Sequence, residues 1–480
     1  MKENQRGTKN YAKVGEKCLW ILTEERPKKE VLEMIFKYFA DDHGFAFLGG
    51  HLCIVPILDS NKDFDFTYEV FGFHCAWVDR VFIKTVSGNS SFTDFLVYYQ
   101  NEMPTPDQEP LYAIEETKTD DKESRNTGVY QRCSKFVYIQ NFFPNTKKVM
   151  LYALQVAQKE EPTETYIFGT RLLLTLGVDI LGKKLDPKIF VPFTSVDEVI
   201  SFKNKMRRPP IGNIPILLSK VDNKIQVSGR LYKSGSLSHD PNIGALSIIG
   251  AVLRVLGWKG DIEVVQHGLS QAHVRNAKNK FILIANQLGM SLKGLQMPKA
   301  QLPDAYWHYD MEGEKLGTIF IHLVVENFTE GFSVFENHAG CEKGYFHTPD
   351  GENIPLAKYT DRDAYKAGDK NQIIFIPDLV LIDIAENESI TIEGKKYENM
   401  LRGIEELNGY DAFEELYLKQ YYPKYKIVRT VVLYGGAEQR IMRVEVGFLL
   451  NKYGKLVLGV RAPRLFTRAI KNLLKYWSRN

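Results

Sequence analysis

Residues 374–395, IFIPDLVLIDIAENESITIEGK, predict two short apolar strands that are joined by an acidic turn. Side chains alternate between the two faces of a strand. Glu393 and Lys395 therefore point to one face, and Ile390 and Ile392 point to the other. Asp378 stands at the start of the first strand. We therefore expect Asp378, Glu393 and Lys395 to meet at one edge of an otherwise apolar sheet.

These residue types suit phosphodiester hydrolysis. Two adjacent carboxylates bind a hard cation such as Mg²⁺, and a nearby lysine can orient water or hold a phosphate oxygen. Pro377-Asp378 and Glu393-Gly394-Lys395 resemble the signature of the PD-(D/E)xK nuclease superfamily. The resemblance implies that Asp378 and Glu393 hold Mg²⁺ while Lys395 positions or activates water. An ordinary surface ion cluster is the alternative.

Composition sets the class of protein. The chain has 480 residues, enough for two or three domains, and 44% hydrophobic and 25% charged residues, as in soluble globular proteins. It has no apolar run of membrane-spanning length and no apolar signal region, so we expect a cytoplasmic protein without a membrane partner. The chain has five cysteines, which are scattered and form no CxxC pair. This pattern supports neither a disulfide framework nor a zinc ribbon.

The Glu-x-Lys pattern recurs at Glu116-Thr117-Lys118, in a strand predicted over residues 111–119. Asp94, in an earlier apolar run, would take the role of the first carboxylate. Asp79 remains a rival, because no proline precedes Asp94. The resemblance therefore implies a second Mg²⁺ centre made of Asp94, Glu116 and Lys118.

Two neighbours of this second set bear on the prediction. Gln131 follows on a predicted helix, where some members of the superfamily carry a supporting glutamine. Glu115 is expected to point to the face opposite Glu116. A degenerate core that only binds DNA or packs against the other core is the alternative to an active one.

The middle of the chain is basic. Residues 201–300 carry 15 Lys and Arg against 4 Asp and Glu, a net charge of +11, so the rest of the chain is net −8. This asymmetry indicates a polyanion-binding segment, with a solvated basic face as the alternative. The residues that we expect to contact DNA are Arg207 and Arg208 in a basic break, and Gln271, His273, Arg275, Asn276, Lys278 and Lys280 on a helix predicted over residues 270–287.

Three further segments yield structural expectations. Residues 318–325 predict a strand, and the apolar stripe over residues 397–407 predicts a helix that packs on a core. The histidines at His308, His322 and His338 fit no metal-nuclease spacing, so structural histidines are favoured.

We therefore predict an α/β protein with two mixed-sheet PD-(D/E)xK-like cores, residues 1–180 and 301–480, and a basic, largely helical DNA-recognition region between them, residues 181–300. The resemblance implies a Mg²⁺-dependent, sequence-specific double-stranded DNA endonuclease similar to type II restriction enzymes, with a cognate DNA methyltransferase as an expected partner. Two different centres in one chain predict a monomer that cuts an asymmetric target, with a dimer as the alternative. The other candidates are a structure-specific repair or recombination nuclease and a non-catalytic DNA-binding protein.

Overall fold

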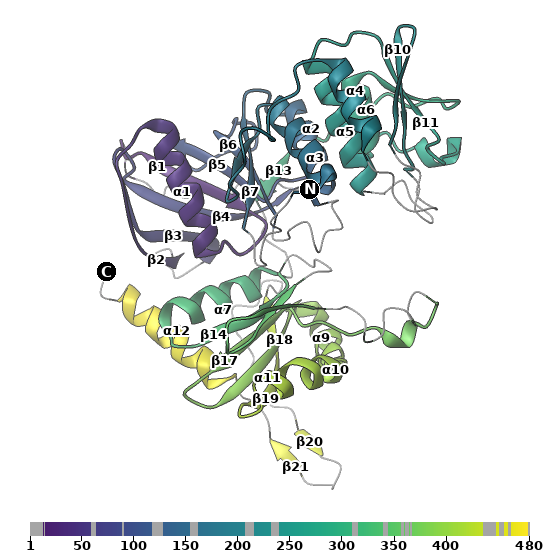
Figure 1. The fold of residues 1–480 in the computed structure, drawn as a ribbon. Coiled ribbons are helices and arrows are strands. Elements are labelled where there is room, and N and C mark those ends of the chain that lie inside the picture. Colours follow the sequence, from purple (N-terminus) through teal and green to yellow (C-terminus); the bar gives the residue numbers. More distant parts are fainter. Residues whose placement is uncertain are drawn as a thin grey trace, which may run out of the picture.

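The fold is mixed α/β, as predicted, with several sheets and helices on both faces of the larger ones (Figure 1). It comes from a computed structural model that describes residues 13, 15–58, 64–88, 91–117, 128–153, 162–206, 216–231, 240–309, 315–338, 344–356, 360, 364, 367–434, 448–450, 456–458 and 462–478. Within these ranges no helix combines the length and apolar character needed to cross a membrane.

A large sheet forms the N-terminal part, with the strand order β2-β3-β4-β1-β5-β6-β7-β8. Its strands are β1 (Cys18–Thr23), β2 (Phe47–Leu58), β3 (Phe64–Cys75), β4 (Arg80–Gly88), β5 (Phe95–Gln100), β6 (Tyr112–Thr117), β7 (Lys147–Tyr152) and β8 (Asp179–Leu181). Strand β5 is antiparallel to β1 and β6, and β6 is parallel to β7. The distant strand β13 (Trp307–Tyr309) also pairs with β4, so the chain returns to this sheet after the basic middle.

Helices cover both faces of the N-terminal sheet. Helix α1 (Lys29–His43) lies on one face, and α2 (Gly128–Tyr138) and α3 (Glu164–Thr175) belong to the core on the other. In α1 the buried side chains recur at helical spacing, and Gly44 ends the helix with a left-handed φ of 63°.

We expected the basic middle to be largely helical, but it also contains a sheet. A four-stranded sheet, β12-β11-β10-β9, accompanies its helices. The elements are α4 (Val196–Lys205), β9 (Leu218–Val221), β10 (Lys224–Ser228), α5 (Asp240–Val255), β11 (Asp261–Val265), the 3₁₀ helix Gln271–Val274, α6 (Lys280–Leu288) and β12 (Met290–Leu292). Strands β9, β10 and β12 have three to five residues, too few for alternation to stand out in the sequence, and they persist because neighbouring strands complete the hydrogen bonding.

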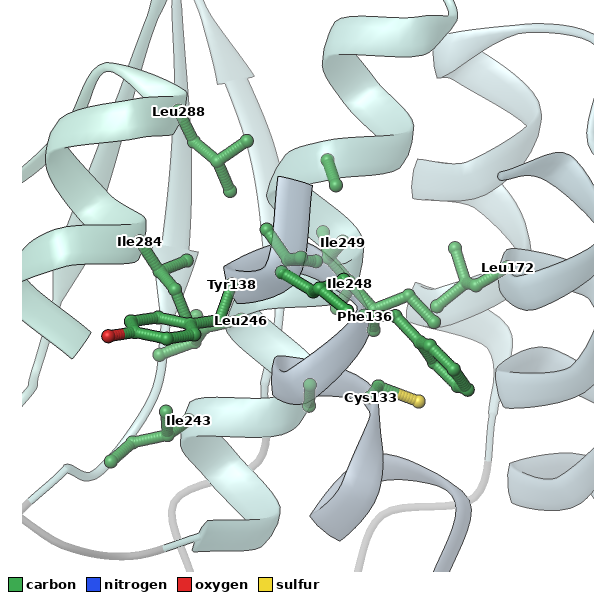
Figure 2. Close-up of a cluster of buried hydrophobic side chains, with 14 of the residues drawn as sticks. Cys133, Phe136, Tyr138, Leu172, Ile243, Leu246, Ile248, Ile249, Ile284 and Leu288 are labelled. Carbon is green, nitrogen blue, oxygen red and sulfur yellow. The ribbon is translucent and has the colours of Figure 1, made fainter. Parts of the chain in front are cut away.

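Figure 2 shows how the middle packs against the helices of the N-terminal part. Phe136 and Tyr138 of α2 lie against Leu246 and Ile248 of α5, in a core that also takes in α3 and α6. The two regions therefore bury one continuous apolar cluster.

A second mixed sheet organises the C-terminal part, with the order β14-β17-β18-β19. Its strands are β14 (Phe332–Glu336), β17 (Leu379–Asp383), β18 (Glu388–Lys396) and β19 (Lys426–Tyr434), which confirms the two strands predicted around the acidic turn. Strand β17 is antiparallel to β14 and β18, and β18 is parallel to β19. The central part β1-β5-β6-β7 of the N-terminal sheet has the same order and directions.

Helices again cover both faces of this sheet (Figure 1). Helices α7 (Lys315–Phe328) and α12 (Arg464–Trp477) pack on one face. On the other lie α9 (Met400–Leu407) and a continuous helix built from α10 (Asp411–Phe413), the π-helical turn Glu414–Leu418 and α11 (Lys419–Tyr421). Peripheral elements are the hairpins β15 (Tyr345–His347) with β16 (Asn353–Pro355) and β20 (Phe448–Leu450) with β21 (Leu456–Leu458), and the 3₁₀ turns Ile139–Asn141, Lys370–Gln372 and Tyr397–Asn399.

Two expectations for this region are wrong. The predicted strand over residues 318–325 lies within α7, whose buried apolar side chains contact both sheets and make the periodicity hard to recognise. The stripe over residues 397–407 does not face a core, because Leu401 is 71% and Ile404 48% exposed. Helix α9 approaches the sheet through its buried Gly403 instead.

Candidate active site

The predicted C-terminal set comes together at the edge of β17 and β18. Leu379 pairs with Ile392, so Asp378 stands directly opposite Glu393. The Gly394 amide donates a hydrogen bond to Asp378 Oδ2 over 2.8 Å, which fixes that carboxylate against the β18 backbone. Two carboxylates thus face each other across one strand pair.

Helix α9 and the turn after it add two groups that sequence reasoning missed. Lys395 Nζ donates a short hydrogen bond to Glu393 and pairs with Glu406 Oε2 at 2.8 Å. The Tyr410 hydroxyl also donates a short hydrogen bond to Glu393. Glu406 and Tyr410 lie beyond the strand motif, and only the way α9 docks brings them to it.

Gly403 makes that docking close. A Cβ built on Gly403 would lie 2.8 Å from Lys395 Cγ and 3.1 Å from Val431 Cγ1. Such distances are too short for ordinary carbon contacts, so a side chain at this position would force α9 away from the lysine.

The electrostatics of the C-terminal centre favour a cation. Burial, followed by the Asp378 charge, raises the pKa of Glu393 to about 7. Burial acts to lower the pKa of Lys395, but Glu393 and Glu406 outweigh it and raise that pKa. Glu393 and Glu406 both pair with Lys395, the exposed Arg402 lies on the other side of Glu406, and the Asp378 charge acts on Glu393. Carboxylate oxygens are the ligands that a hard divalent ion such as Mg²⁺ prefers.

The N-terminal centre repeats this geometry with a different residue in the second position. Phe95 pairs with Ile114, so Glu115 stands opposite Asp94, as Glu393 stands opposite Asp378. The Glu116 amide donates to Asp94 Oδ2 over 2.7 Å, just as Gly394 donates to Asp378. Thr117 therefore occupies the position that Lys395 has in the C-terminal centre.

Our choice of Glu116 as the partner of Asp94 is one residue out of register. Because strand side chains alternate, a shift of one residue sends Glu116 to the α1 face and Glu115 to the α2 face. Lys118 lies outside the described residues, as does the side chain of Gln131. The rival Asp79 accepts a hydrogen bond from the Lys17 amide at the opposite end of the sheet.

Helix α2 supplies the cations of the N-terminal centre. Lys135 Nζ lies 2.8 Å from Glu115 Oε2 and 3.5 Å from Asp94 Oδ1. Arg132 Nη1 lies 2.7 Å from Glu115 Oε1 and 3.4 Å from Asp94 Oδ2. Burial, together with Asp94, raises the pKa of Glu115 against the opposing effect of the two cations. Among the described residues, Arg132 and Lys135 thus offset the charges of Asp94 and Glu115, which makes this set less suited to a divalent ion than the C-terminal set.

The helix that we had predicted over residues 270–287 is interrupted. Gln271 and His273 lie in the 3₁₀ helix, whereas α6 begins separately at Lys280 with Asn279 as its cap. Each segment has its own capping residue, which is why the helix does not run through. The Gln271 amide is bonded to the Gln296 backbone rather than turned outward.

Of the predicted DNA-contacting residues, three have exposed side chains between these two helices: Arg275, Asn276 and Lys278. Arg207 and Arg208 lie outside the described residues. A basic recognition helix is therefore not present at residues 270–287, although a basic turn is.

Comparison with protein families found no family model that matches this chain, and comparison with curated proteins found no match either. A functional assignment therefore depends on the geometry and chemistry of the two centres.

Proposed function

We propose that this protein is a Mg²⁺-dependent double-stranded DNA endonuclease, similar to type II restriction enzymes, and that its C-terminal centre performs the cleavage. One observation carries the proposal: Asp378 and Glu393 oppose each other in register while Lys395 contacts Glu393 in the same cluster. That arrangement unites metal-binding oxygens with a cation for phosphate or water.

Each group has a distinct role. Asp378 and Glu393 would hold the Mg²⁺ ion, which when bound supplies charge stabilisation to the phosphate under attack. Lys395 positions a water molecule for in-line attack on phosphorus or holds a phosphate oxygen. Glu406 orients the lysine, and Tyr410 orients Glu393, through their hydrogen bonds. Glu406 and Tyr410 are thus positioning residues.

The N-terminal centre supports a different role. Its carboxylates are neutralised by Arg132 and Lys135, so we assign no hydrolytic step to it. A chain with a single metal centre cuts both strands by acting twice or by pairing with a second copy. If the two predicted centres each cut one DNA strand, the N-terminal centre would have to use Asp94, Glu115 and Lys135 in place of Asp94, Glu116 and Lys118.

Plasmid cleavage tests these assignments. Supercoiled plasmid with Mg²⁺ is treated with wild type, Lys395→Ala, Lys135→Ala and the control Lys419→Ala, whose side chain is exposed and pairs with Glu415 one helical turn away. We expect Lys395→Ala to lose at least about a hundredfold in rate, in line with removal of a transition-state group, and Lys419→Ala to match wild type. If Lys135→Ala only nicks the plasmid while wild type linearises it, the N-terminal centre cuts one of the two DNA strands.

Two other functions remain open to the same assay. A repair or recombination nuclease would prefer branched or single-stranded substrates to plasmid. A non-catalytic DNA-binding protein would leave every substrate intact with Mg²⁺ or Mn²⁺ while still retarding DNA. The balanced charges of the N-terminal centre favour this second behaviour for that core alone.

A further inference from the structure

Two histidines and a glutamate that play no part in the proposed cleavage converge inside the C-terminal part. His322 lies on α7, Glu336 ends β14, and His338 follows two residues later. One ligand atom from each lies within 4.8 Å of the others. His322 Nδ1 is 3.0 Å from His338 Nε2 and 3.5 Å from Glu336 Oε2. His322 is 1% and His338 6% exposed, so three potential metal-ligating atoms face one another in the interior.

A hydrogen bond to Thr318 bears on which ring nitrogen of His338 carries a proton. The Thr318 hydroxyl donates to the Lys315 carbonyl over 2.8 Å. Its oxygen must therefore accept from His338 Nδ1, which is 3.3 Å away. In a neutral ring the other nitrogen, Nε2, is then unprotonated and faces His322. Histidine ligands of metal ions commonly have their second nitrogen fixed by such an outer partner.

The donor types of the cluster also suit a transition metal ion, because imidazole nitrogen and carboxylate oxygen are both ligands of Zn²⁺. Burial, with Arg26 next, holds the pKa of His322 well below its usual range. Burial acts to raise the pKa of Glu336, but Arg26 and Lys28 outweigh it and hold that pKa well below its usual range. The donor set is thus two imidazoles and one carboxylate.

We propose that His322, Glu336 and His338 form a binding site for one divalent transition metal ion of the Zn²⁺ class, separate from the Mg²⁺ centre. Imidazole nitrogen prefers Zn²⁺ and its neighbours in the transition series, whereas Mg²⁺ prefers oxygen. Three protein ligands leave a position for water, as in other three-ligand zinc sites.

The site would connect the two halves of the molecule near the candidate active site. Arg26 Nε and Lys28 Nζ, from the segment after β1, lie 2.8 and 2.9 Å from the Glu336 oxygens. The amide of Asn337, between the two β14-side ligands, donates to the Asp378 carbonyl over 2.7 Å. A bound ion would therefore hold the strand beside Asp378 and, through Glu336, the N-terminal segment.

The same two cations oppose binding, because a divalent ion would have to share Glu336 with Arg26 and Lys28. Without a metal, His322 and His338 form a plain hydrogen-bonded pair, which is the structural role that the sequence favours. These two states differ in metal content, so a direct measurement separates them.

The experiment uses the full chain after dialysis against a chelator. Zn²⁺ is titrated by calorimetry, and retained metal is measured after gel filtration. We expect wild type to retain one Zn²⁺ per chain, with a higher melting temperature as mass action requires. His322→Gln and His338→Gln should lose both effects. His308→Gln, at an exposed histidine on β13, and Asp378→Asn, at the Mg²⁺ centre, should keep them.

Two results would overturn the proposal. One is wild type that retains no stoichiometric Zn²⁺, and the other is full Zn²⁺ retention in both ligand variants. If the glutamine variants do not fold, X-ray absorption of Zn²⁺-loaded wild type decides. Imidazole scattering from two histidines supports the site, and a shell of oxygen ligands alone refutes it.

Discussion

Glu393 titrates near neutrality because its carboxyl group is buried and faces Asp378. Below its pKa of about 7 the group is protonated and cannot ligate a cation, so at sub-saturating Mg²⁺ cleavage should rise about tenfold per pH unit and level off above neutrality. Higher Mg²⁺ should move the midpoint to lower pH, because the ion competes with the proton. Cleavage rates measured across this range at two Mg²⁺ concentrations test this. If the midpoint of the pH profile is the same at both Mg²⁺ concentrations, Glu393 is not a ligand of the ion.

Glu115 matters to stability even if it has no part in catalysis. Glu115→Gln leaves Arg132 and Lys135 without their shared, fully buried carboxylate, and we expect a loss of about 3 kcal/mol in the free energy of unfolding. Urea denaturation measures it, with the exposed Glu405→Gln as the control, expected within about 0.5 kcal/mol of wild type. Equal stability of the two variants would show that the charge-balanced centre does not support the fold.

The docking of helix α9 on the sheet places Glu406 beside Lys395. Gly403→Ala would place a Cβ 2.8 Å from Lys395 Cγ, so the helix must shift, at a cost of about 1–3 kcal/mol. We expect slower cleavage together with this moderate loss of stability. Gly49→Ala, where the nearest side-chain atom would be 3.5 Å away, is the control. Cleavage assays and thermal denaturation of both variants check the prediction, and an unchanged cleavage rate of Gly403→Ala would contradict it.

The turn between the 3₁₀ helix and α6 carries the predicted DNA-contacting residues Arg275 and Lys278, whose side chains are exposed. If Arg275 and Lys278 each neutralise one phosphate, the double alanine variant should reduce the slope of log affinity against log salt by about 2. Fluorescence anisotropy at several salt concentrations measures the slope. Lys419→Ala should leave it unchanged, and an unaltered slope in the double variant would place the DNA elsewhere.

At the scale of the whole molecule, the basic middle and the N-terminal sheet share one core. Ile248→Ala removes a fully buried side chain of α5 and should cost about 2–5 kcal/mol. Val255→Ala, on the same helix but 61% exposed, should change stability by less than about 0.5 kcal/mol.

A shared core also predicts that both regions unfold together. Hydrogen exchange followed on β6 and β11 should report the same opening free energy, and Ile248→Ala should lower it in both. Loss of protection in β11 alone would show that the middle is an independent unit.

The hairpin of β17 and β18 could be predicted from the sequence, because local periodicity and turn residues encode it within a few residues. Helix α7 and the strands β9, β10 and β12 could not, since burial on several sides hides the helical period and three to five residues are too few to display alternation. Long-range packing decides such segments.

The sequence by itself determined the C-terminal set, because Asp378, Glu393 and Lys395 belong to one hairpin whose alternation brings them together. Only the tertiary structure decided between Glu115 and Glu116, brought Lys135 to the N-terminal centre, and gathered His322 with His338. The physical reason is the range of the interactions. Alternation within a strand is local, whereas strand register and helix docking are set by packing between residues far apart in the chain.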